Sequence, residues 1–260
     1  MMGDVIELRK EKQVLTVAFN RPQSHNAMNP EMIQALAAVF ADISRQDDVR
    51  VVVLTGNGRS FCAGADLTFM REAADYDFDE NVVDGEAIFD LMLAIDQCPK
   101  PVVGRINGTA IGGGVGLVSA CDIAVAVERA RFGFSEVQLG LVPAVISPFV
   151  IAKIGPSRGR DLFLTGVRFD ARFAQRIGLV HQVVAEDALD ATVSERVAQL
   201  LQAAPGAQAA AKELIRTVAY QPQETMRSYT AELIARRRAS EEGREGMSAF
   251  LEKRPPRWRQ

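Results

Sequence analysis

Two short stretches of small residues could stabilise negative charge through their main chain. Residues 60–67 read SFCAGADL, and residues 108–117 read GTAIGGGVGL. Each stretch lies where a predicted strand gives way to a predicted helix, so the first N–H groups of that helix have no intrahelical partner and favour an anion. Small side chains also let a ligand approach the backbone closely. Two such turns could each direct one N–H at the same oxygen.

Glycine-rich turns have other uses, and the residues alone leave one of them open. Neither stretch completes the G-x-G-x-x-G fingerprint of dinucleotide sites, and the chain contains no G-x-x-x-x-G-K-[ST] phosphate loop. Both nucleotide alternatives therefore lose their main support. The remaining alternative is that the glycines only permit tight packing.

Glu136 is an acid whose suitability for proton transfer depends on its surroundings. On its own, a glutamate in the stretch 134–139 (FSEVQL) is most often a solvated strand residue. In an apolar pocket, however, its pKa would rise toward neutrality, which suits a group that exchanges protons.

Other catalytic chemistries find little support. The only histidines are His25 and His181, and no G-x-S-x-G elbow occurs, which makes a serine hydrolase improbable. Cys62, Cys98 and Cys121 lack paired C-x-x-C spacing, so the sequence indicates neither a metal site nor a disulfide framework. Reduced thiols fit a cytoplasmic protein.

Composition predicts a soluble protein with one α/β core and an appendage. The chain has 260 residues, of which 48% are hydrophobic and 24% charged, enough apolar material for one large core. A net charge of -3 provides no basic field for nucleic acid. Residues 1–12 lack the apolar core of a signal peptide, and no run of 18 apolar residues occurs, so we expect no membrane association.

The elements that must position these residues follow from hydrophobic periodicity. Strands are predicted at 14–19, 49–55, 102–106 and 122–127, and helices at 30–46, 66–74, 82–96 and after the triple glycine. Residues 56–64 are expected to form a loop, and the polar residues 75–81 a mobile surface segment. Alternating strands and helices favour an α/β fold with parallel strands.

Beyond Pro143 the pattern becomes helical almost to the end. The predicted helices lie near 146–154, 157–165, 171–177, 187–203, 206–219, 222–239 and 241–253. We therefore divide the chain into a core at 1–200 and a helical region at 201–260.

Several ordered motifs resemble one known family over essentially the whole chain. They are Asn20-Arg21-Pro22, Asn26-Ala27-Met28, residues 61–67, Asn107-Gly108 with Gly112-Gly113-Gly114, Cys121-Asp122-Ile123, residues 132–143 and residues 245–254. In this order they are similar to the crotonase (enoyl-CoA hydratase/isomerase) family. The resemblance implies an α/β spiral of ββα turns, with a C-terminal helical region that builds homotrimers, often paired as dimers of trimers.

The same resemblance implies roles for individual residues. The backbone N–H groups of Ala65 and Gly113 match the family's oxyanion hole for the thioester oxygen, and Glu136 matches the glutamate that faces the α-carbon. Because coenzyme A is part of the substrate, neither a separate cofactor nor a metal is implied.

Coenzyme A contacts are implied at seven positions. Ala63 and Leu67 match backbone contacts to the adenine, and Asp66 lies between them in the same motif. Ala27 and Met28 fall where the family lines the pantetheine arm. Phe250 and Lys253 match positions at the phosphate end.

Gly116 is a departure from the family pattern. Familiar hydratases carry a second glutamate there, which helps to hold the water that adds to the β-carbon. Glu136 could hold the water itself, or Glu72 or Glu86 could enter the pocket. The alternatives are a Δ3,Δ2-enoyl-CoA isomerase with Glu136 as its sole base and, less favoured, a non-catalytic acyl-CoA-binding protein.

Hydration of a 2-enoyl-CoA remains the favoured activity. Residues 113–119, 135–137 and 143–150 resemble a bacterial branch described as methylglutaconyl-CoA hydratase-like. This resemblance implies methylglutaconyl-CoA as a candidate substrate, and a place in fatty acid or branched-chain amino acid metabolism.

Overall fold

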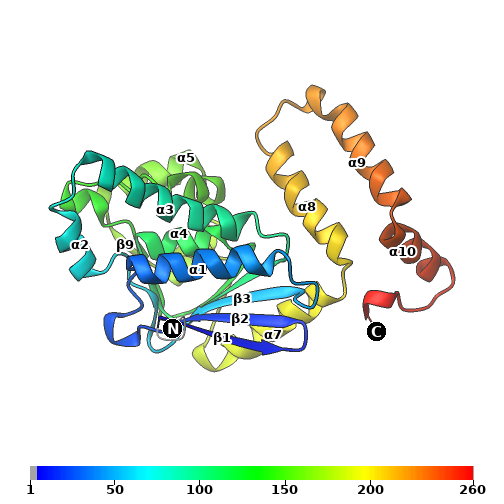
Figure 1. Cartoon of the computed structure of the whole chain (residues 1–260), viewed down its shortest axis with the longest axis horizontal. Coiled ribbons are helices and arrows are strands. Elements are labelled where there is room, and N and C mark those ends of the chain that lie inside the picture. The colour runs from blue at the N-terminus through cyan, green and yellow to red at the C-terminus, as the bar shows by residue number, and fades with distance from the viewer. Residues whose placement is uncertain (1–4, 260) are drawn as a thin grey trace.

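The computed structural model describes residues 5–259, in which a six-stranded sheet forms the centre of the molecule (Figure 1). Its strand order is β1-β2-β3-β5-β7-β10. The bounds are β1 Ile6–Glu11, β2 Val14–Phe19, β3 Val51–Gly56, β5 Val102–Ile106, β7 Ile123–Val127 and β10 Gln182–Val184. Only β1 runs antiparallel to its neighbour. The central strand β3 is buried at every position, as expected of a parallel strand covered on both faces.

A second sheet of four short strands has the order β4-β6-β8-β9. The bounds are β4 Ser60–Cys62, β6 Thr109–Ile111, β8 Arg131–Gly133 and β9 Arg168–Asp170. The first three are parallel to one another, and β9 pairs antiparallel with β8. The chain thus passes from one sheet to the other in the pairs β3–β4, β5–β6 and β7–β8, and each pair is followed by helical structure. The expected ββα spiral is confirmed.

Several of the helices begin after a residue whose side chain accepts a hydrogen bond from a first-turn N–H group. The α-helices are α1 Pro30–Ile43, α2 Leu67–Ala73, α3 Phe78–Asp96, α4 Gly113–Ala120, α5 Ser147–Thr165, α6 Ala171–Arg176, α7 Leu189–Leu201, α8 Pro205–Val218, α9 Arg227–Ala239 and α10 Glu241–Leu251. Asn29 caps α1 by accepting from the Met32 N–H at 3.0 Å, and Pro30 occupies the first turn. Over the part of the chain that the structure covers, none of these helices combines the length and apolar character needed to span a membrane.

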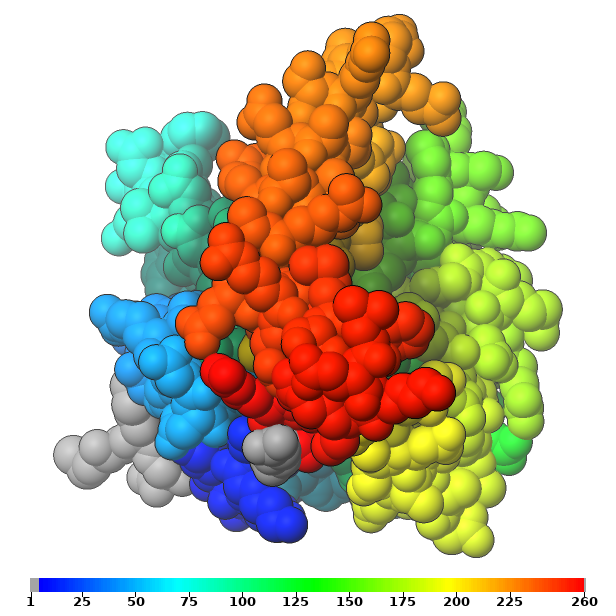
Figure 2. Space-filling model, turned by 90° about the vertical axis from the view of Figure 1, so that its right-hand side faces the viewer, coloured from blue at the N-terminus to red at the C-terminus, as the bar shows by residue number. Residues whose placement is uncertain are grey.

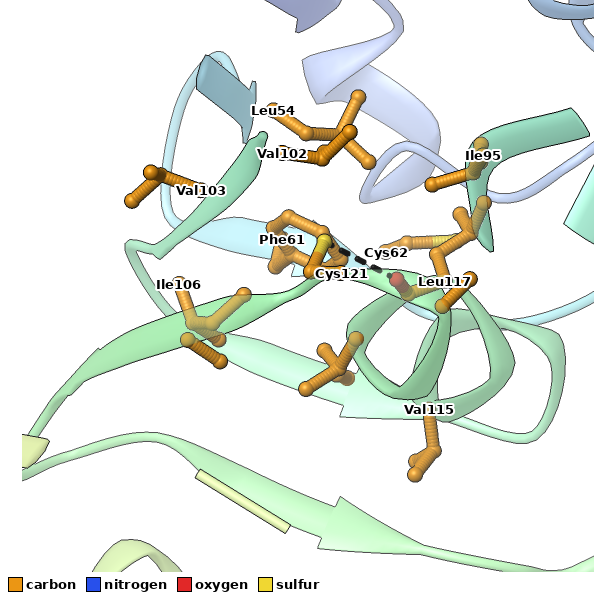
Figure 3. Packing of buried hydrophobic residues seen from close by; sticks show 14 of the residues in the cluster. Leu54, Phe61, Cys62, Ile95, Val102, Val103, Ile106, Val115, Leu117 and Cys121 are labelled. Atoms are coloured by element: carbon orange, nitrogen blue, oxygen red, sulfur yellow. Dashed lines mark hydrogen bonds between the residues drawn. The ribbon is translucent and has the colours of Figure 1, made fainter. Parts of the chain in front are cut away.

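The main core lies between the two sheets and the helices that cover them. Figure 3 shows Leu54 of β3 and Val102 of β5 packed with Phe61 of β4 and Leu117 of α4. The Cys121 thiol donates to the Leu117 carbonyl oxygen at 3.2 Å. Helix α4 therefore packs against side chains from both sheets.

The last three helices project from this core. Figure 1 shows α8 beside the body and α9 and α10 beyond it, and Figure 2 shows α9 and α10 (orange and red) covering that end of the molecule. The far end returns to the core, because the Trp258 indole N–H donates to the Gln202 carbonyl at 3.2 Å and Arg50 donates to the Trp258 carbonyl at 3.4 Å. No residue of α8 or α9 is buried in the single chain.

Several sequence-based expectations need correction. The expected loop at 56–64 contains strand β4, and the helical stretch after Pro143 is interrupted by β9 and β10. The polar segment 75–81 is partly helical, because Asp77 and Glu80 form a reciprocal capping box that starts α3. By contrast, the predicted helices at 146–154 and 157–165 are both present, as the two parts of α5 on either side of the non-helical Gly155.

Candidate active site

Three neighbouring parallel strands deliver the three predicted catalytic residues to one edge of the four-stranded sheet. Ala65 follows β4, Gly113 follows β6 and Glu136 follows β8. The register pairs Cys62 with Ala110, and Ile111 with Gly133. Because parallel strands share a carboxyl edge, the segments that leave them emerge side by side, as at ligand sites of other α/β sheets.

A one-residue β-bridge fixes the main chain at Ala65. The Met28 N–H donates to the Gly64 carbonyl at 2.7 Å, and the Asp66 N–H donates to the Met28 carbonyl at 2.8 Å. In a parallel bridge of this kind, the middle residue directs its own N–H away from the partner strand. Within residues 5–259 the Ala65 N–H has no hydrogen-bond partner.

The second turn depends on glycine at two positions. Gly112 has φ +50° and ψ −119°, a conformation that a side chain would strain, and its N–H donates to the Gly133 carbonyl at 2.9 Å. A Cβ on Gly114 would come within 2.2 Å of the Cys62 carbonyl oxygen. The two turns therefore pack directly against each other. Gly113 opens α4, and its N–H finds no acceptor among the described residues.

Met28 lies against this second turn. A Cβ built on Gly113 would stand 2.1 Å from the Met28 Cε, and both Met28 and Ala27 are buried. The methionine thus contacts the Gly113 backbone from one side and hydrogen-bonds on both sides of Ala65. It joins the two turns that carry the free N–H groups.

Glu136 adjoins the same turn. It starts a 3-10 turn, Glu136–Leu139, and its Oε1 would lie 3.0 Å from a Cβ at Gly112. Burial raises the pKa of this carboxyl above its ordinary value, and its buried Oε2 has no hydrogen-bond partner within the described part of the chain. A half-buried carboxyl with a free oxygen is equipped to exchange a proton with a ligand.

Apolar side chains occupy the space next to Gly116. A Cβ there would approach the Ile146 Cγ2 to 2.5 Å and the Met92 Cε to 3.1 Å. Ile146 and Met92 are both buried. A glutamate at residue 116 would therefore have to displace them.

The other acids considered for this space do not fill it. Glu72 and Glu86 are exposed at the surface of α2 and α3. Asp84, on the same helix as Glu86, is half-buried, and burial raises the pKa of its carboxyl. Asp84 lines a cavity of about 500 Å³ together with Phe69 and Tyr76.

The predicted adenine contacts cluster around the start of α2. The Ala63 N–H donates to the His25 carbonyl at 3.1 Å, and the Leu67 side chain is 72% exposed. Asp66 is occupied within the protein, because its carboxylate caps α2 through the Thr68 N–H at 2.8 Å and pairs with Arg21 at 2.8 Å. Burial would raise the pKa of Asp66, but these hydrogen bonds outweigh it and hold the pKa below its ordinary value.

Phe250 and Lys253 are not brought to this site within one chain. They lie at the end of α10, and Figure 1 places α10 at the opposite end of the molecule from α2. Phe250 is 82% exposed.

The carboxyl edge of the four-stranded sheet carries neither an ionised thiol nor a cluster of metal-binding side chains among the described residues. Cys62 ends β4 beside the first turn, but full burial raises the pKa of its thiol to about 12, so it stays protonated near neutral pH. Between residues 5 and 259, no cluster of three or more histidine, cysteine or acidic side chains could hold a metal ion.

Sequence reasoning did not assign Ile146, Met92 or Arg21 to this region. Gly116 within an otherwise apolar helix was a signal for close approach by another side chain, but it could not identify Ile146 or Met92. The turn motif around Arg21 was visible, whereas the long-range partner of its guanidinium was not.

Comparison with known proteins places the chain among enzymes that act on enoyl thioesters. A sequence profile described as enoyl-CoA hydratase/isomerase matches residues 9–260. A 2,3-dehydroadipyl-CoA hydratase from Escherichia coli is 32% identical over 256 residues, which cover 98% of each chain. A short-chain-enoyl-CoA hydratase from Clostridium acetobutylicum is 32% identical over 249 residues, or 95% of this chain and 94% of the relative. The crystal structure of an enoyl-CoA hydratase from Shewanella pealeana superposes with a TM-score of 0.95 at 38% identity, covering 98% of this chain and 96% of that one.

Proposed function

Because the chain belongs to the enoyl-CoA hydratase/isomerase family, we propose that it hydrates a 2-enoyl-CoA thioester. Membership of this family also means that the chain is an enoyl-CoA hydratase or isomerase rather than a non-catalytic binding protein. The Ala65 and Gly113 N–H groups bind the thioester oxygen, and Glu136 transfers the proton at the α-carbon. The observation that carries this proposal is the shared carboxyl edge of β4, β6 and β8, where two free N–H groups lie beside the half-buried carboxyl of Glu136.

The chemistry follows from where charge develops. Addition of water to the β-carbon of an enoyl thioester moves negative charge onto the thioester oxygen. A fixed donor aimed at such an oxygen contributes about 2.7–4 kcal/mol of transition-state stabilisation. Protonation of the resulting enolate at the α-carbon then needs one acid, and the carboxylate that this acid leaves behind takes up the proton that the added water loses. Glu136, whose burial favours the protonated form, suits that step.

Isomerisation is the second candidate, and one observation favours it. Ile146 and Met92 fill the space beside Gly116, where a second carboxylate would have to lie. A single carboxyl can move a proton between the α-carbon and the γ-carbon without binding water. A Δ3,Δ2-enoyl-CoA isomerase would therefore need Glu136 alone.

The substrate proposal extends the acyl-CoA class to a particular thioester. We propose methylglutaconyl-CoA as the first substrate to test, supported by the motif resemblance and by a relative named for a dehydroadipyl thioester. Ala27, Met28, Ala63, Asp66 and Leu67 form the proposed coenzyme A path. No cofactor is proposed beyond the coenzyme A that the substrate carries, and a cytoplasmic location remains part of the proposal.

A homotrimer or dimer of trimers completes the proposal. Helices α8 and α9 bury no residue in the single chain, and Ile215 of α8 is 64% exposed. A neighbouring copy could cover these residues. It could also bring Phe250 and Lys253 to the coenzyme A of the next subunit.

Product analysis with a panel of thioesters separates the candidates. Crotonyl-CoA, a 3-enoyl-CoA and methylglutaconyl-CoA are each incubated with the enzyme, and the products are identified by mass spectrometry and NMR. We expect 3-hydroxyacyl products. Interconversion of 3-enoyl and 2-enoyl thioesters with no hydroxy product at any chain length would replace the hydratase by the isomerase.

A further inference from the structure

Arg21 belongs to a turn motif to which no role has yet been given. It lies between β2 and α1, and its guanidinium donates to a main-chain carbonyl and to a side-chain carboxylate that are far apart in sequence. Nη1 donates to the Ala27 carbonyl oxygen, and Nη2 lies 2.8 Å from Asp66 Oδ2. Both members of the Arg21–Asp66 pair are largely shielded from water, since their side chains are 17% and 11% exposed. The pair is therefore less screened than a surface ion pair.

The two regions that Arg21 joins are the two sides of the β-bridge at Ala65. Ala27 precedes Met28 on one side, and Asp66 follows Ala65 on the other. The Met28 bonds to Gly64 and Asp66, at 2.7 and 2.8 Å, orient the peptide on each side of Ala65. Arg21 therefore connects the two segments that pair at Ala65, the residue whose N–H is free.

Arg21 is itself held in place by its own turn. Its N–H donates to Asn26 Oδ1 at 2.9 Å, and its carbonyl accepts from the Asn26 N–H at 2.9 Å. Asn26 is fully buried, and its Nδ2 donates to the carbonyls of Asn57 and Ser60 at 2.9 Å each. The turn that carries the guanidinium is thus fixed through Asn26 to Ser60, the first residue of β4.

We propose that Arg21 is a positioning residue that sets the direction of the Ala65 N–H through Asp66 and the Ala27 carbonyl. The guanidinium is occupied by protein groups, so it acts through other residues and does not itself contact the thioester. Without the Arg21–Asp66 pair, Asp66 still caps α2. The guanidinium then no longer connects Asp66 to the Ala27 carbonyl across the β-bridge. The Ala65 donor then moves relative to the Gly113 donor. This inference rests on the proposed function of these two N–H groups.

The test uses a non-reactive thioester, so that polarisation is measured apart from turnover. Butyryl-CoA labelled with ¹³C at the carbonyl is bound to the full-length enzyme, and the carbonyl resonance is recorded by NMR. A hydrogen-bonded thioester carbonyl moves downfield. The variants are Arg21→Lys, Arg21→Gln and Asp66→Asn, of which the last keeps an oxygen to cap α2. Turnover of the best enoyl-CoA substrate is measured in parallel.

Arg129→Lys is the matched control. Arg129 also bridges a carbonyl and a carboxylate, donating to Arg59 at 2.9 Å and to Glu186 at 2.7 Å, but it lies before β8 and not at its carboxyl edge. We expect Arg21→Lys and Asp66→Asn to lose at least half of the downfield shift and about tenfold to a hundredfold in kcat, as for a misplaced catalytic group. Arg129→Lys should retain both.

Each result has a distinct meaning. If the wild-type enzyme binds butyryl-CoA without any downfield shift, the proposed function of Ala65 and Gly113 is wrong. A wild-type shift that persists unchanged in Arg21→Lys and Asp66→Asn overturns the positioning role alone. Should Arg21→Gln fail to fold, the other two variants decide the question.

Discussion

Glu136 and Gly112 are in contact range across the end of the four-stranded sheet, with Oε1 3.0 Å from the position that a Cβ on residue 112 would take. Gly112 also has a backbone conformation suited to glycine alone, and it directly precedes the free N–H of Gly113. One residue therefore borders both the proposed proton-transfer group and the proposed oxyanion donor.

Gly112→Ala should impair the site more than it impairs folding. The strained backbone costs on the order of 1–3 kcal/mol, and the new Cβ presses on Glu136. Gly155→Ala is the control, because Gly155 has φ +73° and ψ 163° but open space around its Cβ. Both variants should show a lower urea midpoint, while turnover per folded molecule should fall only for Gly112→Ala. Equal turnover in the two variants would contradict the contact between Gly112 and Glu136.

Glu136→Gln should nearly abolish turnover while leaving thioester binding in place. The amide keeps the size of the side chain but removes its basicity, and loss of a positioned proton-transfer group costs about 10²–10⁴ in rate. Steady-state kinetics and calorimetric titration with a non-reactive acyl-CoA measure the two effects. Glu72→Gln and Glu86→Gln serve as controls at exposed acids. Full activity in Glu136→Gln, or a comparable loss at Glu86, would move the proton transfer elsewhere.

The pH dependence of stability should also report on Glu136. Burial raises its folded-state pKa, so the folded protein binds this proton more tightly than the unfolded chain does. Its stabilising contribution is therefore present below about pH 4.3, the ordinary value for glutamate, and is lost as the pH rises through the folded pKa. Urea melts between pH 4 and 8 should show Glu136→Gln gaining stability relative to wild type as the pH rises. A difference that stays constant with pH would show that the carboxyl titrates normally.

A carboxylate cannot simply be added at residue 116. Gly116→Glu should destabilise the protein, since overpacking a close-packed core costs typically about 1–3 kcal/mol and the first new atom already meets Ile146. The double variant Gly116→Glu with Ile146→Ala should recover part of that loss and raise hydration of crotonyl-CoA. Thermal melts and hydration assays on both variants make the comparison. A stable Gly116→Glu protein would mean that Ile146 and Met92 yield easily.

Association through the C-terminal helices can be tested on exposed apolar residues. Light scattering should give the mass of a trimer or hexamer, and Ile234→Glu on α9 should shift it toward monomer. Leu8→Glu on β1 is a matched control, because Leu8 and Ile234 are each 49% exposed. A wild-type monomer at micromolar concentration would remove the oligomer from the proposal.

Long apolar runs made parts of this fold predictable from sequence. The strands 14–19 and 102–106 were predicted to the residue. The first is a continuous β-branched or apolar stretch, and the second carries Val102, Val103 and Ile106 around Gly104 and Arg105. The short strands β4, β6 and β8 escaped prediction, since three residues are too few to show a period. Those strands nevertheless determine how the site is assembled. The motif resemblance proposes Ala65, Gly113 and Glu136 as site residues, and the pairing of β4, β6 and β8 explains why these three emerge together.

Side-chain contacts across the fold were beyond sequence reasoning. The apolar wall beside Gly116 comes from Met92 on α3 and Ile146 at the start of α5, which are far from α4 along the chain. The pairing of Arg21 with Asp66 likewise joins residues 45 positions apart. Neither relationship leaves a periodic or local signature.

The separation of α10 from α2 has a thermodynamic consequence. Any coenzyme A molecule that touches Leu67 and Phe250 together must join two copies of the chain, because one copy holds these residues at opposite ends. Ligand binding and subunit association are then linked equilibria, and each must strengthen the other by the same factor. Dilution of the enzyme would weaken its apparent affinity for thioesters, and saturating thioester would hold the assembly together at concentrations where the ligand-free protein dissociates.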